Sequence, residues 1–195
     1  KAADFPVIQL KSALLILFIG ALLFLGRRYL VLILPLLLLV TYLQRWPNND
    51  WQIANCDVGQ GDALVLKVAS KSAVVIDTGP EPKLIDQCLK TLSISQIPLL
   101  IITHPHADHI GGLSGALHNR KVGRVLQSAT RGEVLQVGKM RIEILWPDGA
   151  AHIFTDTGGE GSAINNQSIV ALISTPIYKL LATGDAEPDV QSLLT

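Results

Sequence analysis

Residues 103–112 form the stretch that most constrains how this chain folds and what it can do. They read THPHADHIGG, so three of the five histidines of the 195-residue sequence and one aspartate fall within six positions. A continuous apolar run, residues 97–102, leads into them and is typical of a strand buried on both faces. Imidazole nitrogens and carboxylate oxygens are the ligands that zinc and similar metals select. The stretch therefore predicts a metal site that activates water, at the carboxyl end of a buried strand.

The spacing of these ligands favours two metal positions. His104 and His106 lie two residues apart on an extended segment and can converge on one ion, while Asp108 and His109 face a second. Two ions about 3.5–4 Å apart need a bridging carboxylate, and Asp185, in a Thr-Gly-Asp sequence after a strand, is the candidate. The alternative is a loop of incidental histidines.

The rest of the soluble part reads as an α/β domain that begins with antiparallel strands. Hydrophobic alternation and turn residues predict its elements in chain order. They are a β-hairpin over 63–69 and 73–76, a helix that starts at Pro82, the strand 97–102, a short helix over 110–117, a strand over 122–127, a hairpin over 133–137 and 139–146, a long loop over 147–163, and strands over 168–174 and 178–183.

Two apolar runs, residues 13–26 and 29–43, precede this domain and are separated by Arg27 and Arg28. Each run is shorter than the about 20 residues of a usual spanning helix, and one long helix would bury both arginines in lipid. We therefore expect a transmembrane helical hairpin over residues 1–46, a linker over 47–50 and a soluble domain over 51–195. Arginines in the turn favour the cytoplasmic side, which places the domain outside the cytoplasm. Buried helices of a soluble core are the alternative.

Cys56 and Cys88 leave two interpretations open. Two buried free thiols are favoured because no C-x-x-C spacing is present, and a disulfide is the alternative if the domain faces an oxidising compartment.

Charge argues against a domain that binds DNA over a broad basic surface. Residues 47–195 hold 11 basic and 15 acidic groups, a net charge of −4. A local basic cluster can either contact a DNA backbone or form a solvated face; it consists of Arg120, Lys121, Arg124 and Arg131.

Residues 103–112 match the His-x-His-x-Asp-His signature of the metallo-β-lactamase superfamily. Residues 57–63 (DVGQGDA) and 76–79 (IDTG) resemble a narrower group, the C-terminal domain of the ComEC/Rec2 family of competence proteins. The resemblance implies an αββα sandwich, here incomplete at its C-terminus and preceded by the membrane hairpin. It also implies a multi-pass protein of the inner (cell) membrane whose extracytoplasmic domain takes part in DNA uptake during natural transformation. Its partners would be DNA, membrane lipid and the rest of the competence channel and uptake machinery.

Carried over by residue, the resemblance makes five side chains ligands of two divalent ions, zinc or manganese: His104, His106, Asp108, His109 and Asp185. Asp108 would also orient the attacking water, and hydrolysis would act on the DNA strand that is not imported. Asp62, Asp77 and Ser168 would support the ligands from behind.

Two departures from the superfamily pattern keep other functions open. Residues 165–168 read NNQS and lack a histidine that the superfamily places before the bridging aspartate, and His152 is either a substitute or a solvated loop residue. A last histidine motif would follow Thr195, so we expect the chain to be a fragment. The alternatives are a non-catalytic module that guides DNA with a degenerate metal site, another hydrolase of the superfamily, and a regulatory domain of a protein whose membrane region is the functional core.

Overall fold

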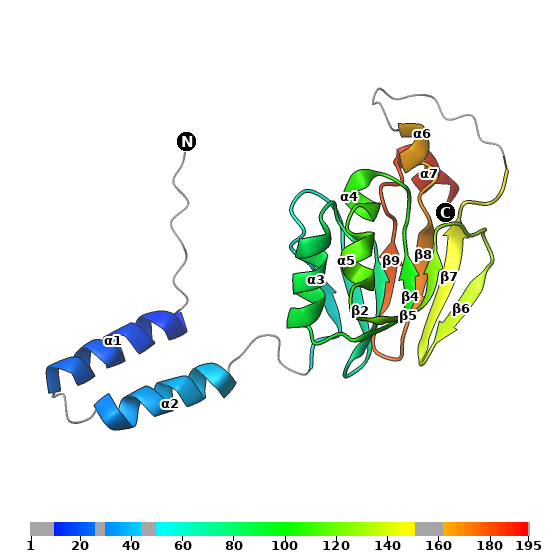
Figure 1. The fold of residues 1–195 in the computed structure, drawn as a ribbon. Coiled ribbons are helices and arrows are strands. Elements are labelled where there is room, and N and C mark those ends of the chain that lie inside the picture. The colour runs from blue at the N-terminus through cyan, green and yellow to red at the C-terminus, as the bar shows by residue number, and fades with distance from the viewer. Residues whose placement is uncertain (1–9, 26–29, 44–49, 151–161, 195) are drawn as a thin grey trace, which may run out of the picture. The chain divides into compact units, whose positions relative to one another are not determined.

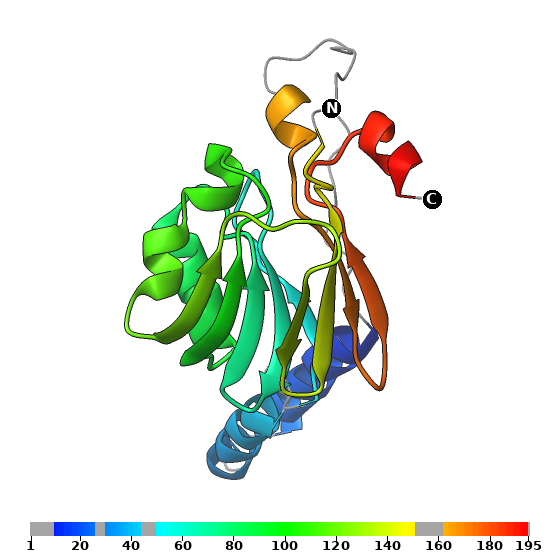
Figure 2. The same cartoon turned by 90° about the vertical axis from the view of Figure 1, so that its right-hand side faces the viewer.

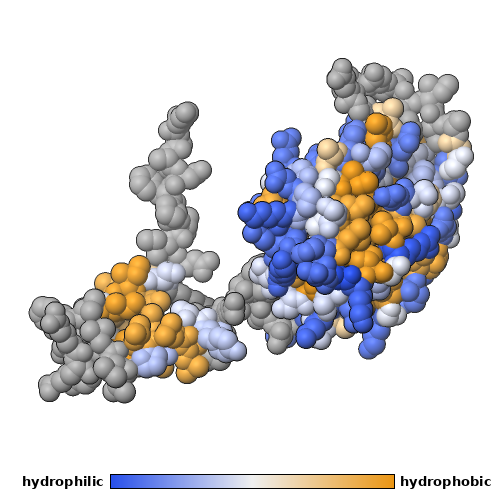
Figure 3. Space-filling view, in the orientation of Figure 1, coloured by the Kyte–Doolittle hydropathy of each residue, from blue (hydrophilic) through white to orange (hydrophobic). Residues whose placement is uncertain are grey.

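The computed structural model describes residues 10–25, 30–43, 50–150 and 162–194. The chain divides into two compact units, Lys1–Asn48 and Asn49–Thr195. The first unit contains helix α1 (Leu10–Leu25) and helix α2 (Leu30–Leu43), the latter with Pro35 inside it. Both helices expose leucine side chains, and α1 also exposes Ile16. Most of the described part of this unit is hydrophobic on the face seen in Figure 3.

The predicted membrane hairpin is not confirmed. Among the described residues, no helix combines the length and the apolar character that crossing a membrane requires. The predicted turn at Arg27 and Arg28 lies outside the described residues, as does most of the predicted linker over 47–50.

The second unit is a sandwich of two β-sheets (Figures 1 and 2). The first sheet has the strand order β1-β2-β3-β4-β5 and the second the order β6-β7-β8-β9. The strands are β1 (Ile53–Asn55), β2 (Leu64–Ala69), β3 (Ser72–Ile76), β4 (Gln96–Ile101), β5 (Lys121–Leu126), β6 (Val134–Val137), β7 (Met140–Trp146), β8 (Val170–Ser174) and β9 (Lys179–Ala182). The pair β2–β3 is antiparallel, as predicted, whereas β3, β4 and β5 run parallel.

Helices lie on the outside of this sandwich. Helices α3 (Pro82–Thr91), α4 (Ala107–Ile110) and α5 (Leu113–Leu117) lie along the outer face of the first sheet in Figure 2. Helices α6 (Ser162–Asn165) and α7 (Pro188–Leu193) lie at one end of the second sheet, where Val190 packs with Trp146 and Val170. The helix–sheet–sheet layering agrees with the predicted α/β sandwich.

Strand β4 supports both layers of the core, because its two faces are apolar. Ile97 and Leu100 pack with Ile85 and Leu89 of α3, and Leu99 and Ile101 pack between the two sheets. The predicted buried strand is confirmed. Its parallel neighbours bring their carboxyl ends to the same edge of the sheet, so a loop that leaves β4 begins at that edge.

The segment after β4 differs from the prediction of one extended loop and one helix over 110–117. The structure has two short helices, α4 and α5, and Asp108 and His109 belong to α4. His106 directly precedes α4 in an extended conformation, and Gly112, which directly precedes α5, packs so tightly that a Cβ would collide with the Thr78 carbonyl. This close contact with the loop that follows β3 lies between the two helices.

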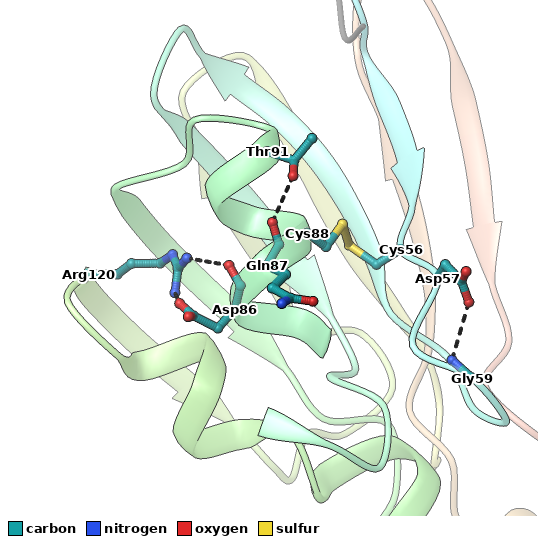
Figure 4. Close-up of a disulfide and its surroundings, with 8 residues drawn as sticks. All are labelled: Cys56, Asp57, Gly59, Asp86, Gln87, Cys88, Thr91 and Arg120. Atoms are coloured by element: carbon teal, nitrogen blue, oxygen red, sulfur yellow. Dashed lines mark hydrogen bonds and ion pairs between the residues drawn. A yellow bond between two sulfur atoms is a disulfide. The ribbon is translucent and has the colours of Figure 1, made fainter. Parts of the chain in front are cut away.

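Cys56 and Cys88 form a disulfide, so the favoured interpretation of two free thiols is wrong (Figure 4). Their Cα atoms are 5.8 Å apart, within the usual range for a disulfide. Cys56 follows β1 and Cys88 lies on α3, so the bond ties the edge of the first sheet to the helix layer. The packing of α3 sets this distance, and sequence spacing cannot reveal it.

Removal of the disulfide is expected to lower the free energy of unfolding by about 3–4 kcal/mol, because the bond closes a loop between residues 32 positions apart. Denaturant unfolding with and without a reductant measures this difference. The Cys56→Ala/Cys88→Ala variant should have the same free energy of unfolding as the reduced protein, and the reductant should not change it. Thiol labelling of the unreduced native protein would contradict the assignment.

Candidate metal centre

The predicted ligands come from three places in the chain and meet at one end of the sandwich. His104 and His106 follow β4, Asp108 and His109 lie on α4, and Asp185 follows β9. The two sheets therefore both contribute to the site, on the end that carries α4, α6 and α7 in Figures 1 and 2.

The centre of the site consists of His104, His109 and Asp185. One potential ligand atom from each of the three residues lies within 4.8 Å of the other two. The two oxygens of Asp185 face different partners: Oδ2 is 3.9 Å from His104 Nε2, and Oδ1 is 3.4 Å from His109 Nε2. A carboxylate in this position can bridge two ions, although the number of ions stays a prediction.

His106 extends the cluster beside His104, and Asp108 extends it beside His109. His106 Nδ1 lies 3.1 Å from His104 Nε2, and Asp108 Oδ2 lies 3.9 Å from His109 Nε2. Ligands of one tetrahedral zinc ion, with bonds of about 2.0–2.1 Å, lie about 3.3–3.4 Å apart. The donor set and its spacing therefore fit a divalent cation with small side-chain adjustments.

Asp77 is a buried carboxylate that supports both central histidines. It accepts hydrogen bonds from the Thr103 amide (2.8 Å) and the Thr103 hydroxyl (2.7 Å), and its Oδ2 is 3.0 Å from His109 Nδ1. Its φ of 58° is uncommon for a residue other than glycine. A strained, buried carboxylate with three partners is typical of a group that orients a functional site.

The second histidine, His104, is held by two hydroxyl groups. Its Nδ1 lies 3.1 Å from Thr103 Oγ1 and 3.2 Å from Ser168 Oγ. Because Thr103 Oγ1 already donates to Asp77, it can only accept from His104, which places the proton on Nδ1 and leaves Nε2 free to bind a cation. Gly184 packs closely against Thr103 and Ser168, where a Cβ would crowd both side chains.

The Asn165–Ser168 segment, which lacks the superfamily histidine, has a supporting place in the structure. The Trp146 indole donates to the Asn166 carbonyl, and the Glu187 amide donates to the Asn166 side chain. These bonds fix the backbone just before Ser168. Sequence reasoning found Ser168 and Asp77 but missed Thr103, Asn166 and Gly184, whose long-range contacts leave no local pattern.

Asp62 reaches the site through its backbone, while its side chain is exposed. Its amide donates to the Asp108 carbonyl (3.3 Å), and its own carbonyl accepts from the Gly79 amide (2.8 Å). Gly61 allows this approach, because it has a φ of 141° and a Cβ there would collide with the Asp108 carbonyl. The backbone of Gly61 and Asp62 thus contacts α4, and a supporting role for the Asp62 carboxylate stays a prediction.

Without a bound cation, the pKa values of the two central histidines shift in opposite directions, so His109 holds its proton more strongly than His104. Burial, with a contribution from the neighbouring His109, lowers the pKa of His104. For His109 burial also acts to lower the pKa, but the hydrogen bond and charge of Asp77 and the charges of Asp185 and Asp108 outweigh it and raise the pKa to about 9. A cation must therefore displace a proton from His109 to bind. The apparent affinity of the site for a cation consequently rises as the pH increases toward 9.

Other predicted candidates lie elsewhere. The Arg120 side chain is buried and bonds Asp86 Oδ1 (2.9 Å) and the Asp86 carbonyl on α3 (Figure 4), so of the basic cluster this arginine neither forms a solvated face nor is free to contact DNA. His118 is exposed beside Asp86. His152, the predicted substitute ligand, lies outside the described residues.

Comparisons with known proteins give a family, two relatives and a fold. A model of the metallo-beta-lactamase superfamily matches residues 56–194. The chain is 31% identical over 163 residues to the uncharacterized protein YcaI of Escherichia coli strain K12, covering 75% of the chain and 20% of the relative. It is 26% identical over 186 residues to ComE operon protein 3 of Bacillus subtilis strain 168, covering 73% and 23%. The chain thus spans about a fifth of the length of these relatives.

A solved structure supports the fold alone. A metallo-beta-lactamase of Cronobacter sakazakii with a HARLDQ motif superposes with a TM-score of 0.50 at 14% sequence identity, over 76% of this chain and 67% of the other. The similarity to ComE operon protein 3 agrees with the resemblance to the ComEC/Rec2 family that residues 57–63 and 76–79 carry.

Proposed function

Because the chain belongs to the metallo-beta-lactamase superfamily, we propose that its second unit is a metal-dependent hydrolase that cleaves phosphodiester bonds of DNA. The observation that carries the proposal is the arrangement of His104, His109 and Asp185, in which one carboxylate faces two imidazoles whose Nε2 atoms are directed to it. Superfamily membership implies metal binding, and we propose two divalent ions, zinc or manganese.

Each side chain of the site has a role in this proposal. His104, His106, Asp108, His109 and Asp185 would hold the cations, and the bound cations would supply Lewis-acid charge for a phosphoryl group and for water. Asp108 orients the attacking water, because its side chain is 42% exposed and can reach a substrate. Asp77, Thr103 and Ser168 keep the two central imidazoles in place.

The biological setting is part of the proposal. The resemblance of residues 57–63 and 76–79 to the ComEC/Rec2 family, together with the similarity to ComE operon protein 3, supports a role in DNA uptake, in which the hydrolase acts on the strand that is not imported. We propose a multi-pass protein of the inner (cell) membrane, with a hairpin over residues 1–46, a linker over 47–50 and an extracytoplasmic domain over 51–195. The Cys56–Cys88 disulfide favours an oxidising compartment for this domain. DNA, membrane lipid and the uptake channel would be the partners.

A nuclease assay with a matched pair of histidine variants tests the proposal. The purified protein, supplied with manganese or zinc, should degrade end-labelled DNA, and His104→Ala should reduce the rate at least about 100-fold. His118→Ala removes an exposed histidine outside the site and should leave the rate unchanged. Equal rates for wild type and His104→Ala would overturn the hydrolase proposal.

A second candidate function is a non-catalytic module that guides DNA. It is favoured by residues 165–168, which contribute Ser168 to His104 where the superfamily pattern has a ligand. DNA binding without cleavage, with either metal, would select this candidate. Cleavage of a lactam or a thioester in place of DNA would select another hydrolase of the superfamily.

A further inference from the structure

The end of the second unit opposite the metal centre has features that the proposed hydrolase does not use. Three strand connections meet there, namely β2–β3, β6–β7 and β8–β9, as Figure 1 shows. Between them lies a pocket of about 260 Å³. Apolar and polar side chains both line it, and the polar ones are Gln52, Lys67, Lys139, Thr175 and Tyr178.

The chemistry of this pocket favours an anion. Lys67 and Lys139 bring two cationic groups to it. The Tyr178 hydroxyl is buried, and it has no hydrogen-bond partner among the described residues. Burial raises the pKa of Tyr178, so the hydroxyl stays protonated and can donate. A buried donor without a partner is costly unless a ligand accepts its hydrogen bond, and a phosphate oxygen next to two lysines would do so.

The two ends of the sandwich differ in charge, although Asp50 lies at the pocket end and Lys83 at the metal end. The end with the pocket carries exposed or partly exposed lysines, which are Lys67, Lys71, Lys139 and Lys179. The metal end carries carboxylates, which include Asp57, Asp62, Asp108, Asp185 and Glu187. A molecule with this charge asymmetry orients on an anionic surface so that the end that carries these four lysines faces the surface.

Apolar and aromatic groups at the same end match a bilayer interface. Ile177, in the β8–β9 connection, is 67% exposed, more than the other large apolar side chains described in this unit. The chain enters the domain here, at Trp51 and Gln52, eight residues after the apolar helix α2 ends at Leu43. Lys67 Nζ lies 5.2 Å from the Trp51 ring centre, and tryptophan beside lysine is typical of an interfacial belt.

We propose that this end, the lysine end, docks on a bilayer that contains anionic phospholipid, with a headgroup phosphate in the pocket between Lys67, Lys139 and Tyr178. Ile177 enters the headgroup region, and the metal centre faces away from the bilayer. The proposal concerns a surface separate from the metal centre and does not depend on hydrolysis.

Labelling of a single thiol tests the docking. The only two cysteines of the chain are paired with each other, so Ile177→Cys adds one reactive site. The chain is mixed with an excess of one of two kinds of vesicle, made of phosphatidylcholine alone or of phosphatidylcholine with about one-third phosphatidylglycerol. A water-soluble maleimide is then added in the presence of a chelator. We expect labelling of position 177 to be at least about fivefold slower on the anionic vesicles. Glu81→Cys, an exposed position at the metal end, should show equal rates on both.

Charge and pocket variants separate specific docking from general attraction. In the Ile177→Cys background, Lys67→Gln/Lys139→Gln should restore fast labelling on anionic vesicles, and Tyr178→Phe should restore it in part. Lys83→Gln/Arg131→Gln removes the same charge from exposed positions elsewhere and should retain protection. Equal rates on the two vesicle types would overturn the proposal. Equal protection by inorganic phosphate or by an oligonucleotide on phosphatidylcholine vesicles would replace lipid by a soluble phosphate ligand and overturn it as well.

Discussion

Replacement of Asp77 by alanine is expected to lower the free energy of unfolding of the second unit by about 3–5 kcal/mol, the cost of breaking a buried charged network. The variant leaves the Thr103 amide, the Thr103 hydroxyl and His109 Nδ1 without their acceptor, all in the interior of the domain. Denaturant unfolding followed by circular dichroism measures the loss. Glu81→Ala removes an exposed carboxylate nearby and should change the free energy by less than about 0.5 kcal/mol.

The milder variant Asp77→Asn separates folding from function. Its amide keeps one oxygen acceptor and nearly the same shape, so the fold should hold while the orientation of His104 and His109 suffers. Cation affinity, measured by calorimetry, should fall about 10–100-fold. If Asp77→Ala unfolds at the same denaturant concentration as Glu81→Ala, the three hydrogen bonds do not stabilise the protein as the geometry indicates.

Asp185→Asn is expected to have the largest effect on cation binding, a loss of at least about 100-fold in affinity. Only this carboxylate among the described ligands faces both central imidazoles, and an amide in its place loses the negative charge between two proposed cations. Calorimetry and metal content per chain measure the loss. The Asp108 carboxylate faces His109 alone, so Asp108→Asn should weaken the binding of one cation and leave the other bound.

Asp57→Asn provides the matched control for these two variants. Asp57 is exposed at the start of the 57–62 loop, and its Oδ1 accepts a long hydrogen bond (3.4 Å) from the Gly59 amide. Its loss should leave cation affinity unchanged. Equal metal content in Asp185→Asn and in wild type would show that this carboxylate does not bridge two ions.

Local pattern predicted the elements that local interactions determine. The apolar run before His104 fixed β4, because a strand covered on both sides needs apolar side chains on both faces. The helix from Pro82 followed from residues spaced along one face, of which Ile85 and Leu89 are buried. The ligand-rich segment was recognised from residue types alone, but its division into α4 and α5, with Gly112 packed against Thr78 between them, was not predicted.

What the sequence could not reveal depends on contacts between distant segments. Thr103 and Ser168 meet at His104 because two sheets pack face to face, and no spacing along the chain encodes this. The charge pattern left open whether Arg120 contacts DNA or lies on a solvated face, but its side chain is buried and bonds Asp86, 34 residues earlier. Cys88 reaches Cys56 only because α3 packs against the first sheet.

The metal centre straddles the seam between the sheets, with His104 and His109 on one side and Asp185 on the other. The Ile169 amide, just before β8, donates to the Thr103 carbonyl, just after β4, across the same seam. A cation held there would crosslink the two sheets, and its binding should slow amide hydrogen exchange in both sheets at once. The converse also follows. A substitution in the core between the sheets, at Leu66 or Ile173, would shift the two sheets relative to each other and would weaken cation binding without replacing a ligand.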